Sequence, residues 1–557
     1  MNENDILEAL GEAGEPFAEA AAPNAAKKRA VAWRRILPAA AALILITVAA
    51  VFLWRGHTPS PVETEKTPTD NTQASATDPA PVSETDPAPV DEPASTPADP
   101  QTAFTDLQVD PTVRSASLLS TPEYPERVLN PAVASNGYAQ EYYEKWFQLR
   151  NAKLAAFHTG RSGDAVTAFF QDAVKLLLAD ADTENAVVSP LNIYLALSML
   201  ADVTSGNSRD ALLSLLHVDS VETLHALCQN LWNAHYQNDG ATTLLLGASL
   251  WLRKGFDYNL DTVSALSNNY YASVFAGDMA DPAYSAELRA WLSQMTGGLL
   301  DQYVSDVNMT DETIMELVTT VLYRVKWLDE FGAAATEPGT FHAPGGDVNA
   351  DFMKRTLMHG PYFWGEHFGA VELNLEDNGR MRLVLPDEGY TPADLLEDPE
   401  ALSYLLARDA WVDNAGTPAG GYYEYEAAWE NVTRDKQVHL SLPKFTVSAD
   451  LTLNGALSSL GLADLFTPGT SDFSPLFAAT PVNETIKATA YIGEVEHAAT
   501  LSVDEEGVTA AAYTRMPLAG AAPPPEEEMD LVFDRPFLFV LISEDRQPLF
   551  IGVVNDP

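Results

Sequence analysis

One segment near the C-terminus decides how this chain folds: residues 503–514 read Val503-Asp-Glu-Glu-Gly507-Val-Thr-Ala510-Ala-Ala-Tyr-Thr514. An acidic pair and a single glycine precede a run of small and β-branched residues. Glycine permits backbone conformations that other residues avoid, whereas β-branched side chains favour the pleated surface of a sheet. The segment is therefore able to be both a loop and a strand, and this dual competence is the first clue to function.

The rest of the C-terminal two thirds predicts an α+β domain. Residues 138–157 and 165–178 carry apolar residues at helical spacing, and residues 185–200 read as a short strand that runs into a helix. Strands dominate later, and their alternation is clearest at residues 373–375, 381–386, 438–447 and 549–554. Helices first and strands interleaved indicate one domain of about 400 residues.

Composition excludes some classes of function. The chain of 557 residues has 32 Lys and Arg against 79 Asp and Glu, for a net charge of −47. Nucleic-acid binding needs clustered basic residues, so no nucleic-acid partner is expected. The single cysteine, Cys228, cannot form an internal disulfide, and we interpret it as a small apolar side chain on a helix face.

The N-terminal segment predicts a membrane anchor. Residues 36–54 contain no charge and are long enough to cross the bilayer as one helix. Basic residues crowd the side before it and only Arg55 follows directly, so residues 1–35 are expected in the cytoplasm and the C-terminal domain outside the cell. A cleaved signal peptide is the alternative, which leaves a shed or secreted domain open.

Residues 55–135 predict an extracellular stalk. They are rich in Pro, Thr and Asp, and Thr-Asp-Pro-Ala-Pro-Val occurs at both 77–82 and 85–90. Such a segment buries too little apolar surface to offset its ordering entropy, so we expect it to be disordered. The folded domain is then assigned to residues 136–557. An anchor, a simple stalk and no disulfide framework suggest a bacterial surface protein.

Several motifs in this domain resemble one family, in order along the chain. They are Asn185-Ala-Val-Val-Ser-Pro-Leu-Asn-Ile193, Leu317-Val-Thr-Thr-Val-Leu-Tyr-Arg-Val-Lys-Trp327, His439-Leu-Ser-Leu-Pro-Lys-Phe445, Glu505-Glu-Gly507, Phe533-Asp-Arg-Pro-Phe537 and Leu549-Phe-Ile-Gly552. Together they resemble the serpins, the serine protease inhibitors, over residues 162–557. The resemblance implies the serpin fold, in which helices pack on a large mixed central sheet beside smaller sheets and a reactive-centre loop is exposed.

The resemblance also implies a mechanism. A serpin is not an enzyme but a suicide substrate: a target protease cleaves the exposed loop and becomes acylated, and the freed loop inserts into the central sheet with the protease attached. A monomer without cofactor or metal is implied, with a serine protease as partner. A non-inhibitory serpin that acts as a surface binding or substrate-like protein is the alternative.

The hinge of that loop corresponds to one continuous run: Glu505, Glu506, Gly507, Val508, Thr509, Ala510, Ala511 and Ala512. In an inserted strand side chains alternate, so every second residue would face the core: Val508, Ala510, Ala512, Thr514, Met516 and Leu518. Two features differ from the family pattern. Val508 stands where threonine is usual, and Pro517 would lack a ladder N–H.

In the serpins that this segment resembles, the reactive bond lies a set number of residues after the hinge glycine, and counting from Gly507 then implies Ala521–Ala522. Small residues there suit a shallow specificity pocket, which resembles an elastase-like or subtilisin-like target. Counting back from Phe537 gives a site nearer Pro525–Glu526, and a trypsin-like cut at Arg515 is also conceivable, although it would leave too short a strand.

Other positions match the parts of the family's central sheet that open. Trp327 and Lys444 match the breach, where the loop first enters, and a Lys444–Glu505 ion pair is expected there. Ser189, Asn192 and Thr319 match the shutter, although serine and asparagine are usual at the last two positions. A Ser189-based catalytic triad is disfavoured because no Gly-x-Ser-x-Gly elbow surrounds this serine, and the histidines lack metal-ligand spacing.

Overall fold

A computed structural model describes most of the C-terminal domain. It covers residues 115, 117–131, 140–158, 162–179, 181, 183–301, 307–358, 360–406, 429, 431–480, 483, 490–493, 495–508, 527–544 and 546–557. The predicted anchor at 36–54 and most of the predicted stalk lie outside these residues. Among the helices described, none combines the length and the apolar character that crossing a membrane requires.

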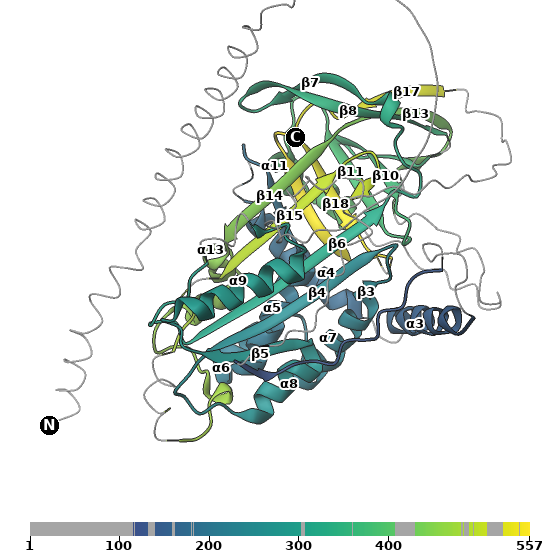
Figure 1. Cartoon of the computed structure of the whole chain (residues 1–557). Helices are drawn as coiled ribbons and strands as arrows, with labels where there is room; N and C mark the ends of the chain where they lie inside the picture. The colour runs from purple at the N-terminus through teal and green to yellow at the C-terminus, as the bar shows by residue number, and fades with distance from the viewer. Residues whose placement is uncertain are drawn as a thin grey trace, which may run out of the picture. The chain divides into compact units, whose positions relative to one another are not determined.

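Three sheets form the framework of the described residues (Figure 1). The central sheet has the order β1 (Leu118–Ser120), β5 (Ala272–Gly277), β4 (Thr243–Arg253), β6 (Met315–Lys326), β16 (Gly507–Val508), β15 (Glu496–Val503) and β14 (Phe445–Thr452), and β3 (Gln237–Asn238) pairs with β4. The second sheet has the order β12 (Val432–Thr433), β9 (Tyr362–Trp364), β10 (Phe368–Asn374), β11 (Arg380–Pro386), β18 (Phe537–Ile542), β19 (Pro548–Val554) and β2 (Ala186–Val188). The third has the order β17 (Glu527–Val532), β13 (Lys436–Pro443), β8 (Gly346–Met358) and β7 (Glu337–Ala343).

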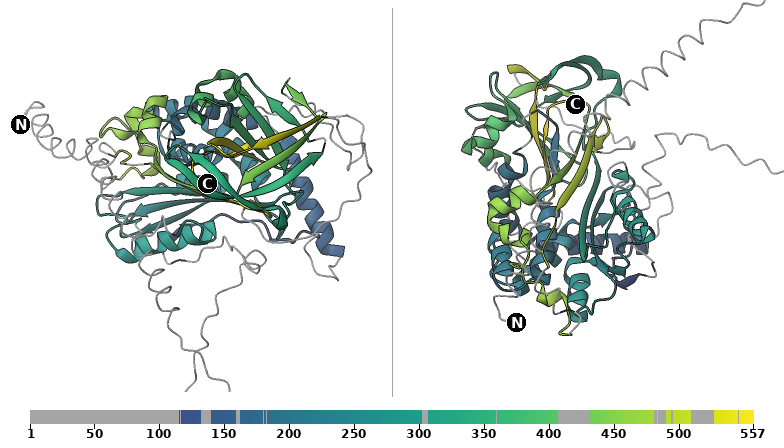
Figure 2. Two further views of the ribbon diagram at one scale, coloured as in Figure 1. Left: turned by 90° about the horizontal axis from the view of Figure 1, so that it is seen from above. Right: turned by 90° about the vertical axis from the view of Figure 1, so that its left-hand side faces the viewer.

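Helices cover both faces of the central sheet (Figures 1 and 2). In chain order they are α3 (Gln140–His158), α4 (Ser162–Leu177), α5 (Pro190–Val203), α6 (Gly206–Leu215), α7 (Val221–His235), α8 (Leu260–Tyr270), α9 (Pro282–Thr296), α11 (Pro392–Glu397), α12 (Pro399–Leu405) and α13 (Asn454–Leu457). Helix α5 packs between β6 and β19, whereas α9 lies across β4 and β6 on the opposite face. The order of helices and strands confirms the predicted α+β class.

Local sequence explains where the helices that border the central sheet begin and end. Ser189 caps α5 by accepting a hydrogen bond from the Asn192 amide, and Pro190 follows at the first helical position, where its missing N–H is harmless. Asp281 caps α9 in the same way, and Gly297 ends it with the left-handed φ of 61° that glycine tolerates best. The start of α5 and both ends of α9 are therefore fixed by short-range signals.

The core lies between the central and second sheets. Strands β18 and β19 are buried along their whole length, as continuous apolar runs predict for strands covered on both faces. Phe445 of β14 contacts Phe537 and Phe539 of β18 at ring-centroid distances of 5.6 Å. These aromatic contacts tie the C-terminal motifs to the sheet that carries the hinge. Cys228 is buried on α7, as its interpretation as a packing residue predicts.

The structure divides one predicted strand into two. Alternation predicts a single strand over residues 438–447, but Pro443 ends β13 in the third sheet and Phe445 begins β14 in the central sheet. Lys444 lies at this junction, and its amide donates to Asp351 in β8 rather than to a strand of the central sheet. The change of sheet brings the Lys444 side chain to the top of β14, next to the hinge.

Some residues of the predicted stalk, before the predicted domain boundary at residue 136, pack against the domain. Residues 117–131 fall within the predicted stalk, yet Leu118–Ser120 form β1, which pairs antiparallel with β5, and Val128 is buried. No strand signal is visible here because three residues at a sheet edge have no periodicity to detect. The rest of the stalk assignment lies outside the described residues.

Candidate functional site

The candidate site is the space between β6 and β15 in the central sheet. Strand β6 pairs with β4 along one edge over residues 315–324, but its other edge pairs only with the two residues of β16 among those described. Strand β15 likewise pairs with β14 throughout and meets β16 only at Val503. Below β16, therefore, the described residues of β6 and β15 have no strand between them.

The two residues of β16 occupy the entrance of this space. Gly507 lies opposite Lys326, and Val508 lies opposite both Val325 and Val503. Both pairings are antiparallel, so a strand that continued from Val508 would run down the space in register with β6 and β15. Val508 is 1% exposed and belongs to the hydrophobic core.

Only glycine fits at position 507. A Cβ atom there would lie 2.4 Å from the carbonyl oxygen of Val325 and 2.7 Å from the Cα of Lys326. Both are backbone atoms, which cannot move aside as a flexible side chain does. The hinge glycine is therefore required for close approach of two strands, rather than for an unusual backbone angle.

The turn that leads into β16 is held by its own residues and by the end of β6. Asp504 Oδ1 accepts hydrogen bonds from the amides of Glu506 and Gly507, at 2.9 and 3.2 Å. The buried Trp327 donates through its indole Nε1 to the Asp504 carbonyl, and through its amide to the Glu506 carbonyl. Trp327, predicted as a breach residue, thus contacts the hinge directly.

The expected ion pair between Lys444 and Glu505 is present. Lys444 Nζ lies 2.7 Å from Glu505 Oε1, which also accepts a hydrogen bond from Thr336 at 2.7 Å. Burial alone would raise the pKa of Glu505, but the hydrogen bonds from Lys444 and Thr336 outweigh it and hold this pKa below its usual value. The pair joins the hinge to the start of β14, so it fixes the turn against the half of the sheet that contains β15.

The pKa of the neighbouring Glu506 is shifted in the opposite direction, above its usual value. Burial raises its pKa, an effect that the charge of Lys326 opposes and the nearby carboxylates reinforce. Lys326 is buried at the end of β6 and lies 3.6 Å from Glu330. No sequence pattern pointed to Lys326 and Glu330, because their relation to the hinge depends on the pairing of β6 with β16.

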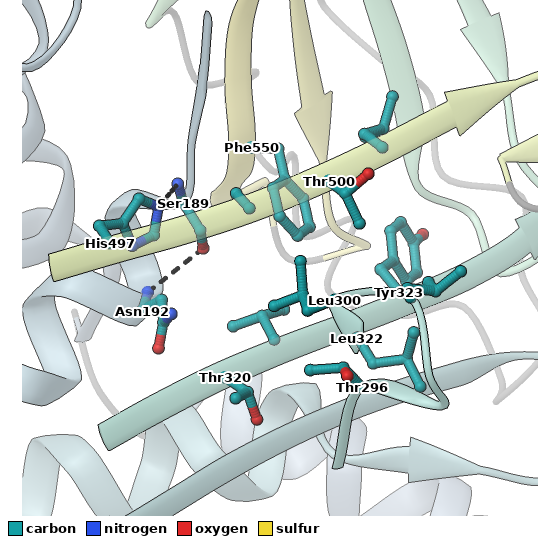
Figure 3. Close-up of a pocket in the computed structure, with 14 residues that line it drawn as sticks. Ser189, Asn192, Thr296, Leu300, Thr320, Leu322, Tyr323, His497, Thr500 and Phe550 are labelled. Atoms are coloured by element: carbon teal, nitrogen blue, oxygen red, sulfur yellow. Dashed lines mark hydrogen bonds between the residues drawn. The ribbon is translucent and has the colours of Figure 1, made fainter. Parts of the chain in front are cut away.

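Below β16 the space is filled from both faces (Figure 3). A cavity of about 20 Å³, room for about one water molecule, remains there. Its lining includes Thr320, Val321, Leu322 and Tyr323 of β6 and His497, Ala499, Thr500 and Leu501 of β15, with Leu299 and Leu300 after α9 and Phe550 of β19. A full strand cannot enter until β6 and β15 separate further, since neighbouring strands need about 4.8 Å.

The predicted shutter residues meet at the far end of this cavity. Asn192 Nδ2 donates to the Thr319 carbonyl of β6 at 3.2 Å, and Thr319 Oγ1 donates to the Asn192 carbonyl at 3.4 Å. Ser189 Oγ accepts from the Asn192 amide at 3.3 Å. Asn192 thus exchanges hydrogen bonds with Thr319, at a level where β4 is the one described strand that pairs with β6. The structure brings Ser189, Asn192 and Thr319 together, as the sequence predicted.

His497 completes this group, although no sequence motif indicated it. Its Nε2 accepts a hydrogen bond from the Ser189 amide at 3.1 Å, so the contact joins the start of α5 to β15 (Figure 3). Burial lowers the pKa of His497 to about 4, because the imidazolium form would be desolvated. A lone histidine in the strand just before the hinge is the one signal that could have drawn attention to it.

The remaining predicted site residues fall outside the described part of the chain. These are Thr509, Ala510, Ala511 and Ala512 of the hinge and Ala521 and Ala522 of the reactive bond. The described ends of this segment are Val508 in the central sheet and Glu527, where β17 begins to pair with β13 in parallel. The segment therefore joins the entrance of the central sheet to the edge of the third sheet.

The site lacks the geometry of a hydrolase in its described residues. His497 contacts the backbone amide of Ser189 rather than its hydroxyl, so the two do not form a nucleophile–base pair. The described residues also contain no group of three or more side chains suited to hold a metal ion. The geometry offers instead a strand-shaped space whose first two positions are occupied by the hinge.

A comparison with known families identifies this arrangement. The model of the family described as "Serpin (serine protease inhibitor)" matches residues 164–557. The chain belongs to the serpin family. Among its relatives are alpha-1-antitrypsin of Meriones unguiculatus, 26% identical over 69% of this chain and 87% of the relative, and leukocyte elastase inhibitor of Equus caballus, 26% identical over 71% and 98%.

Solved structures show the same fold. The native state of the thermophilic serpin tengpin matches with a TM-score of 0.57 and 23% identity. The match covers 77% of this chain and 97% of tengpin. Human thyroxine-binding globulin matches with a TM-score of 0.56 and 19% identity, over 72% of this chain and 100% of the globulin. These matches confirm the predicted serpin fold and carry no finer conclusion, because the identities are low.

We expect the Lys444–Glu505 ion pair to slow heat-induced polymerisation of this serpin. Glu505→Gln should polymerise faster on heating than the unaltered serpin, because the turn loses its tie to β14, and the combined exchange Glu505→Lys with Lys444→Glu should slow polymerisation again. The measurement is the rate of ladder formation on native gels. Glu527→Gln is the control, since the Glu527 side chain is 75% exposed and 4.0 Å from Lys436. Equal rates for Glu505→Gln and the control would contradict the role of the pair.

His497 predicts a specific loss of stability in mild acid. In the folded chain the pKa of His497 is about 4, below its ordinary value of 6.5. Between these two pH values the unfolded chain therefore binds a proton at His497 that the folded chain does not bind. The free energy of unfolding should therefore fall between pH 6.5 and pH 4 by about 2–3 kcal/mol more in the wild type than in His497→Gln. Urea unfolding across this range measures the difference. Parallel pH profiles for the two proteins would show that His497 is not the titrating group.

Proposed function

We propose that this serpin inhibits extracellular serine proteases by suicide-substrate cleavage of its reactive loop, covalent trapping of the protease and insertion of the loop into the central sheet. The observation that carries the proposal is the position of Gly507 and Val508. They already form the first rungs of a new strand between β6 and β15, whose facing edges below them lack a strand partner in the described residues. The chain itself acts as an inhibitor in this scheme, not as an enzyme.

The energetics favour insertion once the loop is cut. Roughly fourteen inserted positions would each gain backbone hydrogen bonds worth about 0.5–1.5 kcal/mol net, on the order of 10 kcal/mol in total. This gain is similar to the whole stability of an ordinary domain, about 5–15 kcal/mol. Before cleavage the loop is held at both ends, by β16 and by β17, so most of this gain cannot be realised.

The inward series of the loop suits the space it would enter. Because Val508 faces the core between Val325 and Val503, alternation places Ala510, Ala512 and Thr514 inward as well. Small side chains at these positions add little volume beneath the sheet. Arg515 and Tyr513 would face outward, whereas the larger Met516 and Leu518 would face inward further along. Pro517 would lie within the inserted strand and would leave one ladder hydrogen bond unmade.

The target class follows from the proposed reactive bond. Ala521–Ala522 offers small residues, which favours an elastase-like or subtilisin-like protease with a shallow specificity pocket. One relative carries the name leukocyte elastase inhibitor, which is consistent with such a target. The sequence arguments for an anchor at residues 36–54 extend the proposal to a single-pass protein with its serpin domain outside the cell.

A second candidate is a non-inhibitory serpin that binds a ligand or is merely cleaved. Corticosteroid-binding globulin of Oryctolagus cuniculus, whose name describes binding, is 26% identical to this chain over 393 residues. This function does not require the hinge to enter the sheet further. The two candidates therefore differ in the fate of the loop after cleavage.

A cleavage experiment separates them. Pancreatic elastase or subtilisin, mixed with the full chain, should give an SDS-stable complex of protease and serpin if the loop inserts. The cleaved serpin should also melt on the order of 10 °C higher than the intact one, because about 10 kcal/mol of ladder bonds is added. Mass spectrometry of the released peptide locates the bond. Cleavage with neither complex nor thermal gain would support the second candidate.

Two neighbouring substitutions test the direction of the side chains. Ala512→Arg would place a charge inside the sheet and should turn the inhibitor into a substrate, with at least tenfold less complex, because an unpaired buried charge costs several kcal/mol. Ala511→Arg carries the same charge on the outward face and should leave complex formation nearly unchanged. The yield of covalent complex on a denaturing gel is the measurement. Equal loss in both variants would contradict insertion in this register.

A further inference from the structure

A part of the described chain that precedes the serpin family match packs against the domain. Residues 117–131 and helix α3 come before residue 164, where the match begins. Tyr124 contacts the ring of Trp232, and Asn130 donates through its amide to the Asp239 carbonyl. Helix α3 lies beside α7 at the edge of the domain (Figure 1). This packing creates a surface that residues 164–557 alone would not have.

A cavity of about 480 Å³ lies between this N-terminal part and the domain. Its volume is within the range of small-molecule sites, about 300–1,000 Å³. Its walls come from residues 125–128, from α3, from α7 and from β3. The apolar contribution is mainly aromatic: Trp146 of α3 and Tyr236 directly after α7, with Leu149 beside them. Trp232 of α7 is 1% exposed and stacks between Tyr236 and Tyr271, so it supports this wall from behind. A flat apolar body would be well accommodated here.

Most charged groups around the cavity are already compensated. Arg150 forms a bidentate pair with Glu544, at 2.6 and 2.5 Å, and Lys153 lies 3.9 Å from the same carboxylate. Asp239 accepts hydrogen bonds from the Trp146 indole at 3.3 Å and from the amide of Thr242 at 2.9 Å. These two acids and two cations therefore need no charged ligand to balance their charges.

Arg127 differs from them. It lines the cavity and is exposed, and its Nε donates to the Asn238 carbonyl at 3.3 Å. No carboxylate of the described residues pairs with its guanidinium, although the whole chain carries 79 acidic residues against 32 basic ones. An arginine with no acidic partner among the described residues, at the mouth of an aromatic-walled cavity, is suited to a carboxylate or sulfonate.

We propose that this cavity binds a small aromatic anion, with its acidic group at Arg127 and its ring system against Trp146 and Tyr236. The site is distinct from the hinge and from the space between β6 and β15. It requires both the N-terminal part and the family domain, since each supplies one wall. The proposal does not depend on whether the serpin inhibits a protease.

The test measures binding of 2-naphthoate to the full chain by isothermal titration calorimetry, with all variants in the same detergent. The neutral analogue 2-naphthylmethanol shows whether charge matters. We expect one site per chain for 2-naphthoate, and Arg127→Gln should weaken its binding about five- to tenfold while leaving 2-naphthylmethanol unchanged. Arg434→Gln is the matched control, because Arg434 is another exposed arginine, located between β12 and β13. Trp146→Ala should weaken both compounds.

Three results would overturn the proposal. Equal affinity of 2-naphthoate for Arg127→Gln and Arg434→Gln would remove the assignment of the anionic group. Binding that Trp146→Ala does not weaken would exclude the cavity as the location, and the absence of any saturable binding would exclude the site altogether. Arg127 is exposed, so its substitution leaves the fold intact, and thermal melting of each variant verifies this.

Discussion

The hydrogen-bonded insertion of Gly507 and Val508 between β6 and β15 is the constraint on which the site depends. It holds the upper ends of the two strands apart by the width of a strand, and it fixes the register that any continuation would adopt. The contact is possible because position 507 has no side chain, since backbone atoms of β6 lie where a Cβ would be. The entrance to the sheet is thus held open by the segment that is proposed to fill it.

Polar contacts at both ends of the space between β6 and β15 hold the two strands in this arrangement. At the top, Lys444 and Trp327 hold the turn of the hinge, which ties it to β14 and to the end of β6. At the bottom, Asn192 donates a hydrogen bond to the Thr319 carbonyl of β6, and His497 of β15 accepts one from the Ser189 amide at the start of α5. Each contact has modest energy, about 0.5–1.5 kcal/mol for a neutral hydrogen bond. The sheet is consequently held by interactions weaker than the ladder that insertion would form.

Short-range patterns predicted much of this arrangement, and particular residues show why. The start of α5 and the apolar run of β19 are local signals, and both lie where the sequence predicts them. Of the hinge motif, Gly507 and Val508 pair with β6 in the central sheet. The ion pair of Lys444 with Glu505 was inferred from the family resemblance rather than from spacing. His497 was missed because a buried histidine and a surface histidine look the same in sequence. Strand β1 was missed because it is defined only by its pairing with β5.

The sequence by itself determined the class of domain and the order of its elements, and it indicated the segment that is proposed to change from loop to strand, since periodicity, capping and composition act over a few residues. Only the tertiary structure decided which side chains meet across the space between β6 and β15, how little room remains in it and how the N-terminal part closes a cavity against α7. Those features join residues up to hundreds of positions apart, and their energies depend on burial and distance, which no local pattern encodes.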